Sequence, residues 1–215
     1  MVTNTPGPAR RPRRDALENR AGIIAAATTA IAHDPHASLD VIARGAGLSR
    51  RALYGHFEDR DALIREILAA GAPRFNEIGL GIDDPEPTVA LARLTARLWR
   101  EAAMVQVAAS IALDDAHVHE TADMLAPLRR VLMDLVRRGQ EDATLRTDMP
   151  AATVARLIEE TARSVIGHLD AASPESARVV VKAVLSIAGL SWNASVALLA
   201  EHPDVLGDAV ARKAA

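Results

Sequence analysis

Four polar side chains that could bind a polyanion lie close together in the sequence: Arg50, Arg51, Tyr54 and His56. The arginines carry planar, permanently charged guanidinium groups, which suit phosphate oxygens or the O6 and N7 edge of guanine. The tyrosine and the histidine add short-range hydrogen-bonding groups. Gly55 between them leaves a gap that either allows close approach of a partner or forfeits a contact. The group predicts contacts to the phosphates and base edges of DNA.

Two short helices and a tight turn are expected to hold these side chains, within residues 38–57. Ser38 and Ser49 each stand at a predicted helix N-cap, where a serine hydroxyl can accept from an unpaired amide. Asp40 in the first turn suits the positive end of the helix dipole. Gly47 lies at the turn, because glycine takes the positive φ that other residues resist. The pattern predicts a helix-turn-helix.

Helical spacing separates the apolar from the polar residues of this unit. The apolar positions are Leu39, Ile42, Ala43 and Ala46 in the first helix and Ala52, Leu53 and Phe57 in the second. Leu48 can pack on Leu53 as a hydrophobic staple that fixes the direction of the second helix. An Arg-Arg pair on a helix can also be no more than a solvated face. The two caps, the turn and the polar group in one window favour DNA recognition.

The segment from about Arg20 to Leu68 resembles the N-terminal domain of the TetR family of transcriptional regulators. The matching motifs are Ile42-Ala43-Arg44-Gly45-Ala46-Gly47-Leu48-Ser49 and Leu53-Tyr54-Gly55-His56-Phe57. Arg60 stands where the family usually has lysine. Gly45 replaces the usual helix former, at a cost of about 1 kcal/mol for a glycine inside a helix.

The resemblance implies a role for each matching position. The residues expected to contact the phosphate backbone are Ser38, Ser49, Tyr54, His56 and Arg60, and those expected to face base edges are Arg50, Arg51 and Gly55. It also implies a homodimer, since two heads related by a two-fold axis can bind a palindromic operator.

Further helices are expected around the helix-turn-helix, and together they form a DNA-binding domain of residues 15–75. Asp15 and Glu18 resemble a capping box for a first helix that runs to about Ala32. Asp59 can cap a fourth helix that ends near Gly71 and Pro73. Residues 1–14, rich in proline, glycine and arginine, are predicted to be disordered. This basic arm either tracks the minor groove or serves as a solubilising tail.

Charge divides the chain into a basic head and an acidic body. Residues 1–75 contain eleven Lys and Arg against eight Asp and Glu, and the remainder contains fourteen against twenty. A basic head is expected when only one end meets a polyanion. The chain has no cysteine, which excludes disulfides and is compatible with a cytoplasmic location. No secretory signal and no apolar run long enough to span a membrane are expected.

Residues 76–215 are expected to form a helical domain for ligand binding and dimerisation, so the predicted fold class is all-α. Residues 79–87 are predicted to be a linker, with Asp84 and Pro85 opening the next helix and Pro127 kinking a later one. The helices at about 150–168 and 174–190 carry more apolar surface than one bundle needs. Pairing of this hairpin with its copy in a second subunit would bury the surplus.

A small molecule that enters this larger domain is expected to shift its helices, move the fourth helix as a lever and release the DNA, as in a repressor. Candidates to line its pocket, each of which could instead belong to the core, are Trp99, Met104, Met124, Met133, His168 and Trp192. With five aromatic residues in the chain, a mostly aliphatic ligand is expected.

Two other classes of function are alternatives to a DNA-binding regulator. An enzyme is not expected, because the sequence has no nucleophile elbow, phosphate loop or H-E-x-x-H pair. No cofactor or metal is expected either, and His117 and His119 beside Asp114 and Asp115 are better explained as a polar loop. The remaining alternative is a helical interaction module that has kept the fold and lost specific DNA binding, for which Gly45 and Gly55 are the only hints.

Overall fold

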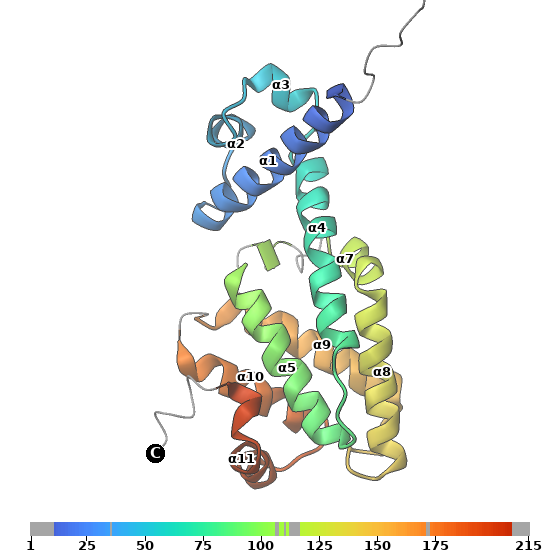
Figure 1. Ribbon diagram of the computed structural model, residues 1–215. Coiled ribbons are helices and arrows are strands. Elements are labelled where there is room, and N and C mark those ends of the chain that lie inside the picture. The colour runs from blue at the N-terminus through green and yellow to red at the C-terminus, as the bar shows by residue number, and fades with distance from the viewer. Residues whose placement is uncertain are drawn as a thin grey trace, which may run out of the picture. The chain divides into compact units, whose positions relative to one another are not determined.

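The computed structural model describes residues 11–34, 36–105, 108–109, 111, 117–170 and 173–207. Over these residues the chain forms helices and connecting loops and contains no strand (Figure 1). The predicted all-helical fold class is therefore confirmed. The chain divides into two compact units, Met1–Leu68 and Ala69–Ala215. Among the helices so described, none is both long and apolar enough to cross a membrane.

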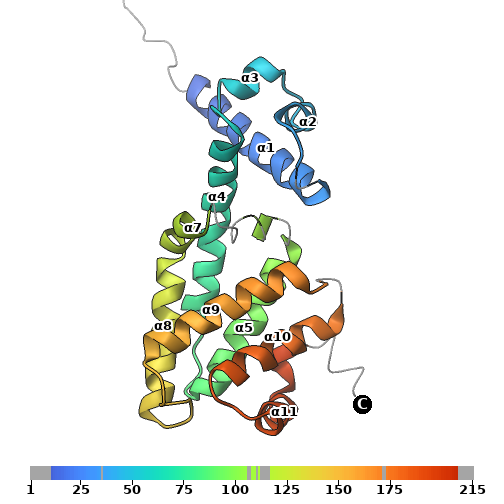
Figure 2. The same cartoon turned by 180° about the vertical axis from the view of Figure 1, so that it is seen from behind.

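The smaller unit consists of α1 (Arg11–His33), α2 (Leu39–Gly45), α3 (Arg50–Tyr54) and the beginning of α4 (Arg60–Leu80). α2 packs against both α1 and α3, as the front and back views show (Figures 1 and 2). The inner faces of these helices form one buried core, made by Ile23, Ala27, Ile31, Ile42, Ala43, Leu53, Phe57, Leu63 and Ile64. Burial of Leu53 in this core fixes the position of the short α3.

α1 begins at Arg11, four residues before the predicted start at Asp15. The prediction of a disordered arm over residues 1–14 is therefore wrong for its last four residues, and residues 1–10 lie outside the described part of the chain. Arginine is a good helix former. Pro12 is also compatible with a first turn, where the amide that proline lacks would have no partner.

α4 continues to Leu80, whereas the sequence predicted its end near Gly71 and Pro73. A proline inside a helix removes one backbone hydrogen bond. Packing of the helix beyond the proline offsets this loss. Gly79 lies so close to Leu128 that a Cβ added to the glycine would be 2.7 Å from Cδ1 of Leu128. The predicted boundary between residues 75 and 76 falls inside this helix.

The larger unit contains the end of α4 and six further described helices. They are α5 (Pro87–Met104), α7 (Val118–Met124), α8 (Ala126–Glu141), α9 (Ala151–His168), α10 (Pro174–Ile187) and α11 (Trp192–Glu201), followed by the short 3-10 helix η1 (Pro203–Leu206). α5 packs against α8, α9, α10 and η1 and is the centre of the unit. Its buried positions include Leu91 and Leu94, which are three residues apart and so lie on one face of the helix.

Two prolines open helices at places that the sequence analysis did not predict. α5 begins at Pro87, with Glu86 as N-cap, rather than at Asp84 and Pro85. Asp84 instead accepts from the Glu86 amide at 3.0 Å within the preceding loop. Pro127 lies in the first turn of α8 and does not kink a helix, because its missing amide costs nothing there.

Candidate nucleic-acid interface

Both predicted serine caps are present at the helix-turn-helix. The Ser38 hydroxyl accepts from the Val41 amide at 3.4 Å, and the Ser49 hydroxyl accepts from the Ala52 amide at 3.2 Å. Gly47 in the turn between the two helices has a φ of +68°, the left-handed conformation predicted for it. Caps and turn therefore fix where α3 begins and how the chain enters it.

α3 turns one side into the core and the other to solvent. Leu53 is fully buried and Phe57 nearly so, whereas the side chains of Arg50, Arg51 and Tyr54 are exposed. The other predicted contact residues follow the same order: Ser38, Ser49 and Gly55 are exposed, and His56 and Arg60 are half-buried. The structure thus brings the predicted base-facing arginines to the surface of one short helix.

The two glycines that depart from the family pattern occupy helix ends. Gly45 is the last residue of α2, and Gly55 is the C-cap of α3 with an ordinary φ of −72°. The predicted cost of about 1 kcal/mol applies to a glycine inside a helix, so it does not apply in full to Gly45. An added Cβ on Gly45 would meet only Ala26, at 3.9 Å.

Asp40 makes a contact that the sequence analysis missed. Its carboxylate pairs with Arg50 through Oδ1, 3.1 Å from Nε, and accepts a hydrogen bond on Oδ2 from Nη1 at 3.3 Å. The guanidinium carbon also lies 5.5 Å from the centre of the Tyr54 ring. The pKa of Arg50 is raised above its ordinary value, first by hydrogen bonding to Tyr54 and then by attraction to Asp40.

Arg20 was also missed, although it joins three elements of the smaller unit. Its guanidinium lies 4.6 Å from the centre of the Phe57 ring, and Nη1 donates to the His56 carbonyl at 3.2 Å. Nη2 pairs with the Glu66 carboxylate of α4 at 2.8 Å. The residue therefore ties α1 to the segment that leaves α3. Only contacts distant in sequence show this role, so helical spacing could not reveal it.

α4 is capped as predicted. The Asp59 carboxylate accepts from the Ala62 amide at 2.6 Å, and Arg60 is the first residue of the helix. This places Arg60 one loop beyond the end of α3.

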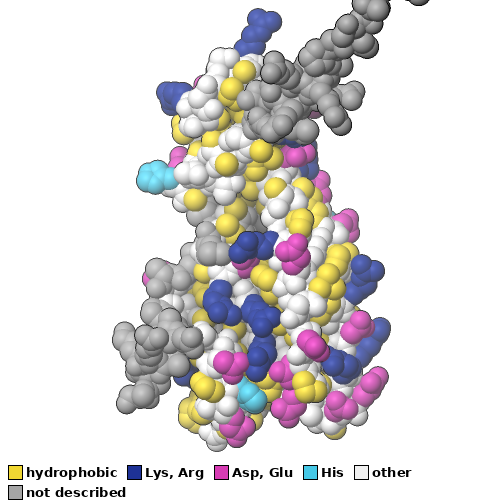
Figure 3. Space-filling model, in the orientation of Figure 1, with side chains coloured by type: hydrophobic (Ala, Val, Ile, Leu, Met, Phe, Trp, Pro, Cys, Tyr) yellow, Lys and Arg dark blue, Asp and Glu magenta, His cyan; other side chains and the backbone are white. Residues whose placement is uncertain are grey.

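A second group of arginines lies on α5 of the larger unit, where dark blue side chains gather on the visible face (Figure 3). Arg93 pairs with Asp84 at 3.1 Å and with Asp204 at 2.9 Å. Arg97 donates to the Gly81 carbonyl at 3.1 Å. These two side chains hold the loop before α5 and the C-terminal 3-10 helix, so they serve the fold of this unit.

The candidate pocket residues do not share one environment. Trp99 is buried in α5 and Met133 packs against the core, while Met124 is half-buried at the end of α7. The pocket prediction is wrong for Trp192, which is 70% exposed, and for the exposed His168, because such side chains cannot line an enclosed cavity. The Met104 side chain lies outside the described atoms.

The predicted polar loop around the histidines is partly helical. His117 is the buried N-cap of α7, and His119 lies in the first turn of that helix. Asp114 and Asp115 fall outside the described residues. Within the described part of the chain, no group of three or more metal-ligating side chains comes together.

The predicted dimer hairpin exists as α9 and α10, which pack against each other (Figure 2). α10 ends at Ile187, three residues before the predicted end of the segment. The core of a single chain already buries much of the apolar surface of these two predicted segments, including Val154, Ile158, Val180, Val181, Val184, Leu185 and Ala188. On α10 the large apolar residue left in solvent is Val179, which is 48% exposed.

Comparison with known proteins identifies the smaller unit directly. Residues 23–67 match the family described as "Bacterial regulatory proteins, tetR family". This stretch runs from the middle of α1 into α4 and includes the whole helix-turn-helix. No curated protein sequence gives a significant match to the chain.

Solved structures, among them the TetR family transcriptional regulator PfmR, share the fold over most of the chain. PfmR from Thermus thermophilus is 19% identical, with a TM-score of 0.64 over 79% of this chain and 98% of its own. FadR from Bacillus subtilis, solved with stearoyl-CoA, is 14% identical, with a TM-score of 0.62 over 79% and 97%. RolR, solved with resorcinol, is 16% identical, with a TM-score of 0.62 over 86% and 95%. At these identities the likeness concerns the fold.

Proposed function

Since the chain belongs to the TetR family of DNA-binding transcriptional regulators, we propose that it is a repressor that binds a palindromic operator as a homodimer and leaves it when a small molecule binds. The observation that carries the proposal is α3, which is capped by Ser49 and seated by the buried Leu53. It presents Arg50 and Arg51 to solvent at its first turn. The family is one of regulators, and no catalytic step is part of the proposal.

The exposed residues divide into two roles in the proposed complex. Arg50 and Arg51 at the start of α3 read base edges, because the first turn of a recognition helix enters the major groove most deeply. Gly55 leaves room for the DNA at the far end of the helix. The residues proposed to hold phosphates and set the register are Ser38, Ser49, Tyr54, His56 and Arg60.

Selection from a library of duplexes with a randomised core tests the DNA-binding part of the proposal. We expect enrichment of a palindrome whose half-sites lie one helical turn, or a multiple of it, apart. Binding should weaken steeply as salt rises, because phosphate contacts release counterions. Binding with no sequence preference at any salt concentration would instead support the alternative, a helical module that has lost specific DNA recognition.

The proposed dimer uses the α9–α10 hairpin. Val179 supports this, because a large apolar side chain left 48% exposed on α10 gains by burial in an interface. Substitution of Val179 by Glu should shift the protein from dimer to monomer in sedimentation velocity. Val196 on α11 is 39% exposed and lies outside the hairpin, so Val196→Glu is the matched control. Equal behaviour of the two variants would contradict this interface.

The proposed effector acts through α4, which contributes residues to both units. In the larger unit, the side-chain Nδ2 of Asn76 donates to the Met124 carbonyl at 3.0 Å, and its Oδ1 accepts from the backbone amide of Leu128 at 3.1 Å. These bonds tie α4 to the junction of α7 and α8. A ligand that shifts α7 would therefore pull on α4 through Asn76.

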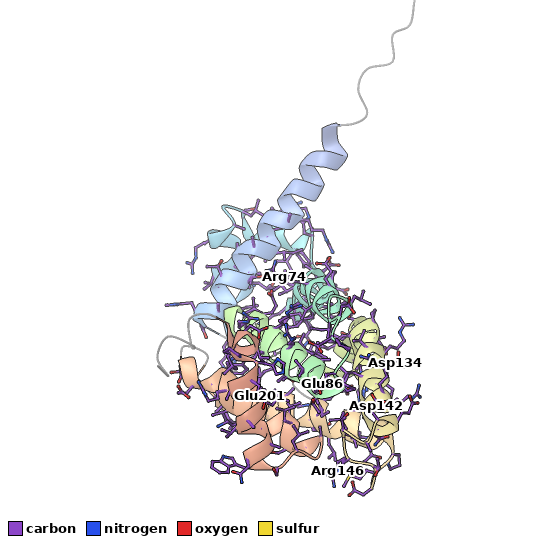
Figure 4. The ribbon with its side chains drawn as sticks, turned by 60° about the horizontal axis from the view of Figure 1, so that its bottom comes forward. Arg74, Glu86, Asp134, Asp142, Arg146 and Glu201 are labelled. Carbon is purple, nitrogen blue, oxygen red and sulfur yellow. The ribbon has the colours of Figure 1, made fainter. Side chains whose placement is uncertain are left out.

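Arg74 provides a second tie between α4 and the rest of the larger unit (Figure 4). Its Nε pairs with Glu101 of α5 at 2.5 Å, and the Glu101 side chain is only 11% exposed. The pKa of Arg74 is raised, mainly by its hydrogen bond to Glu101. A displacement of α5 is thus also transmitted to α4.

The ligand class is proposed to be mostly aliphatic. The packed core of the larger unit consists mainly of Leu, Val and Ala, and the structural relatives include one solved with stearoyl-CoA and one solved with resorcinol. These two compounds are suitable first probes. We expect stearoyl-CoA to release the selected duplex more readily than resorcinol, and Asn76→Ala to reduce that release while leaving ligand binding intact. Failure of both probes to bind would remove support for this class.

A further inference from the structure

Asp40 lies in the first turn of α2, a position that by itself predicts only an interaction with the helix dipole. The structure gives it a partner ten residues away, Arg50, the first residue of α3. Two guanidinium nitrogens contact the two carboxylate oxygens, Nε at 3.1 Å from Oδ1 and Nη1 at 3.3 Å from Oδ2. The Nη1–Oδ2 contact is a hydrogen bond and the Nε–Oδ1 contact is an ion pair. Together they favour one orientation of the guanidinium plane, whereas a single contact would leave it free to turn.

The Tyr54 ring confines the same guanidinium from another direction. The Arg50 guanidinium carbon lies 5.5 Å from the ring centre, within the range of a cation–π contact. Arg50 and Asp40 nevertheless remain accessible, with side chains 67% and 48% exposed. A guanidinium has five N–H donors. The contacts to Asp40 therefore leave donors that face solvent and are available to a ligand.

Arg51 supplies an internal comparison on the same helix. It is exposed like Arg50, but among the described residues it has no carboxylate within ion-pair distance. A free arginine can follow any nearby phosphate, because the long side chain has many rotamers. An arginine held in one orientation loses less entropy on binding and accepts fewer partners. The carboxylate also repels phosphates, which disfavours non-specific contact at this point.

We propose that Asp40 is a specificity-determining positioning residue, which acts through Arg50 by aiming its guanidinium at one base edge and away from the phosphates. The proposal rests on the DNA-binding function proposed above. Asp40 itself contacts no base in it. The consequence is that loss of the carboxylate should change which sequences are distinguished more than how tightly DNA in general is bound.

Asp61 makes a matched control possible. Asp40 is the second residue of α2, and Asp61 is the second residue of α4, also in a first turn. Among the described residues Asp61 has no arginine within ion-pair distance. Asp61→Asn therefore removes the same charge from the same kind of position in the same unit, without releasing Arg50.

The experiment compares four variants: Asp40→Asn, Asp61→Asn, Arg50→Ala and the double variant Asp40→Asn/Arg50→Ala. The affinity of each is measured for the duplex that the unaltered protein selects and for every single base-pair variant of that duplex. Asp40→Asn should lose about five- to tenfold of the discrimination at one base pair of each half-site. Asp61→Asn should keep the full profile. Once Arg50 is replaced by Ala, Asp40→Asn should cause no further loss.

Two results would overturn the proposal. One is an unchanged discrimination profile in Asp40→Asn, with a general rise in affinity equal to that of Asp61→Asn, which would make Asp40 a charge and nothing more. The other is a loss of discrimination by Asp40→Asn that persists in the Arg50→Ala background, which would mean that Asp40 does not act through Arg50. If the unaltered protein selects no sequence at all, the proposed function itself fails, and that outcome is distinct from both.

Discussion

Arginine serves different purposes in the two units of this protein. On α3 of the smaller unit, Arg51 projects into solvent with no carboxylate partner within the described structure. In the larger unit, Arg93 holds two carboxylates, and Arg146 donates to the Ile187 carbonyl while pairing with Asp148 in the loop after α8 (Figure 4). Abundance of arginine therefore does not mark a binding surface. What marks it is an arginine that keeps guanidinium donors facing solvent, as the 67% exposed Arg50 does despite its pair with Asp40.

The same contrast holds for electrostatics. The Arg146 guanidinium lowers the pKa of the Asp148 carboxyl through a hydrogen bond and raises its own pKa in return. Arg146 uses all three of its guanidinium nitrogens within the fold, two on Asp148 and one on the Ile187 carbonyl, and so has little to offer a partner. A cation that is to bind DNA must instead keep donors available, as Arg51 does within the described part of the chain.

Core substitutions should separate the units most strongly. Leu53 in the smaller unit and Leu185 in the larger unit are both fully buried. Replacing either by Ala should cost about 3 kcal/mol of stability through lost burial and a cavity. Hydrogen exchange followed by segment should show faster exchange confined to the unit that carries the change. Acceleration spread evenly over both units by Leu53→Ala would mean that they unfold together.

Arginine substitutions should then separate binding from folding. Arg51→Ala should relax discrimination at one base position by about 1 to 3 kcal/mol, with no loss of stability. Arg60→Ala should weaken binding to all sequences alike, because a phosphate contact carries no sequence information. Arg93→Ala should instead lower the free energy of unfolding by about 1 kcal/mol and leave operator affinity unchanged. Uniform loss in both Arg51→Ala and Arg60→Ala would refute the division between reading and positioning.

The smaller unit was also the part that the sequence predicted best. Ser38, Gly47, Ser49 and Asp59 each act over three or four residues, so their types and spacing suffice to place the caps and the turn. Arg20 and the partnership of Asp40 with Arg50 depend on contacts across 10 to 46 positions, which no local pattern contains. Short-range chemistry was therefore enough to predict the caps and the turn, whereas the contacts of Arg20 and of Asp40 with Arg50 could be found only from the tertiary structure.

The larger unit shows the converse. Its helices were predicted, but α4 ran past Pro73 because Asn76 and Gly79 are held by distant partners. Trp192 was proposed for a pocket on its size alone, and it lies in solvent. The apolar stripe of α9 and α10 was read as surplus because the sequence does not show that α5 covers it. Periodicity identifies an apolar face but not the element that buries it.

The contribution of the three Arg20 contacts to stability can be measured by comparison with an exposed arginine of α4. Arg20→Ala removes the contact with Phe57, the bond to the His56 carbonyl and the pair with Glu66, and should destabilise the smaller unit by about 1 to 2 kcal/mol. Operator affinity should fall as the end of α3 loosens. Arg65 is exposed on α4, so Arg65→Ala is the control and should leave stability unchanged. Equal melting temperatures for the two variants would show that the three contacts contribute nothing.

The smallest effect compares one cap in each unit. Ser49 and Ser191 both accept a hydrogen bond from the third following amide at 3.2 Å, one at the start of α3 and the other at the start of α11. Each Ser→Ala change should cost about 1 kcal/mol of local helix stability, because an amide of the first turn loses its acceptor. Only Ser49→Ala should also weaken operator binding, since α3 is five residues long and is aimed by its cap, whereas α11 carries no part of the proposed interface. Titration of the selected duplex with each variant measures its operator affinity. An equal loss of affinity in both variants would mean that the Ser49 cap acts on overall folding rather than on the direction of α3.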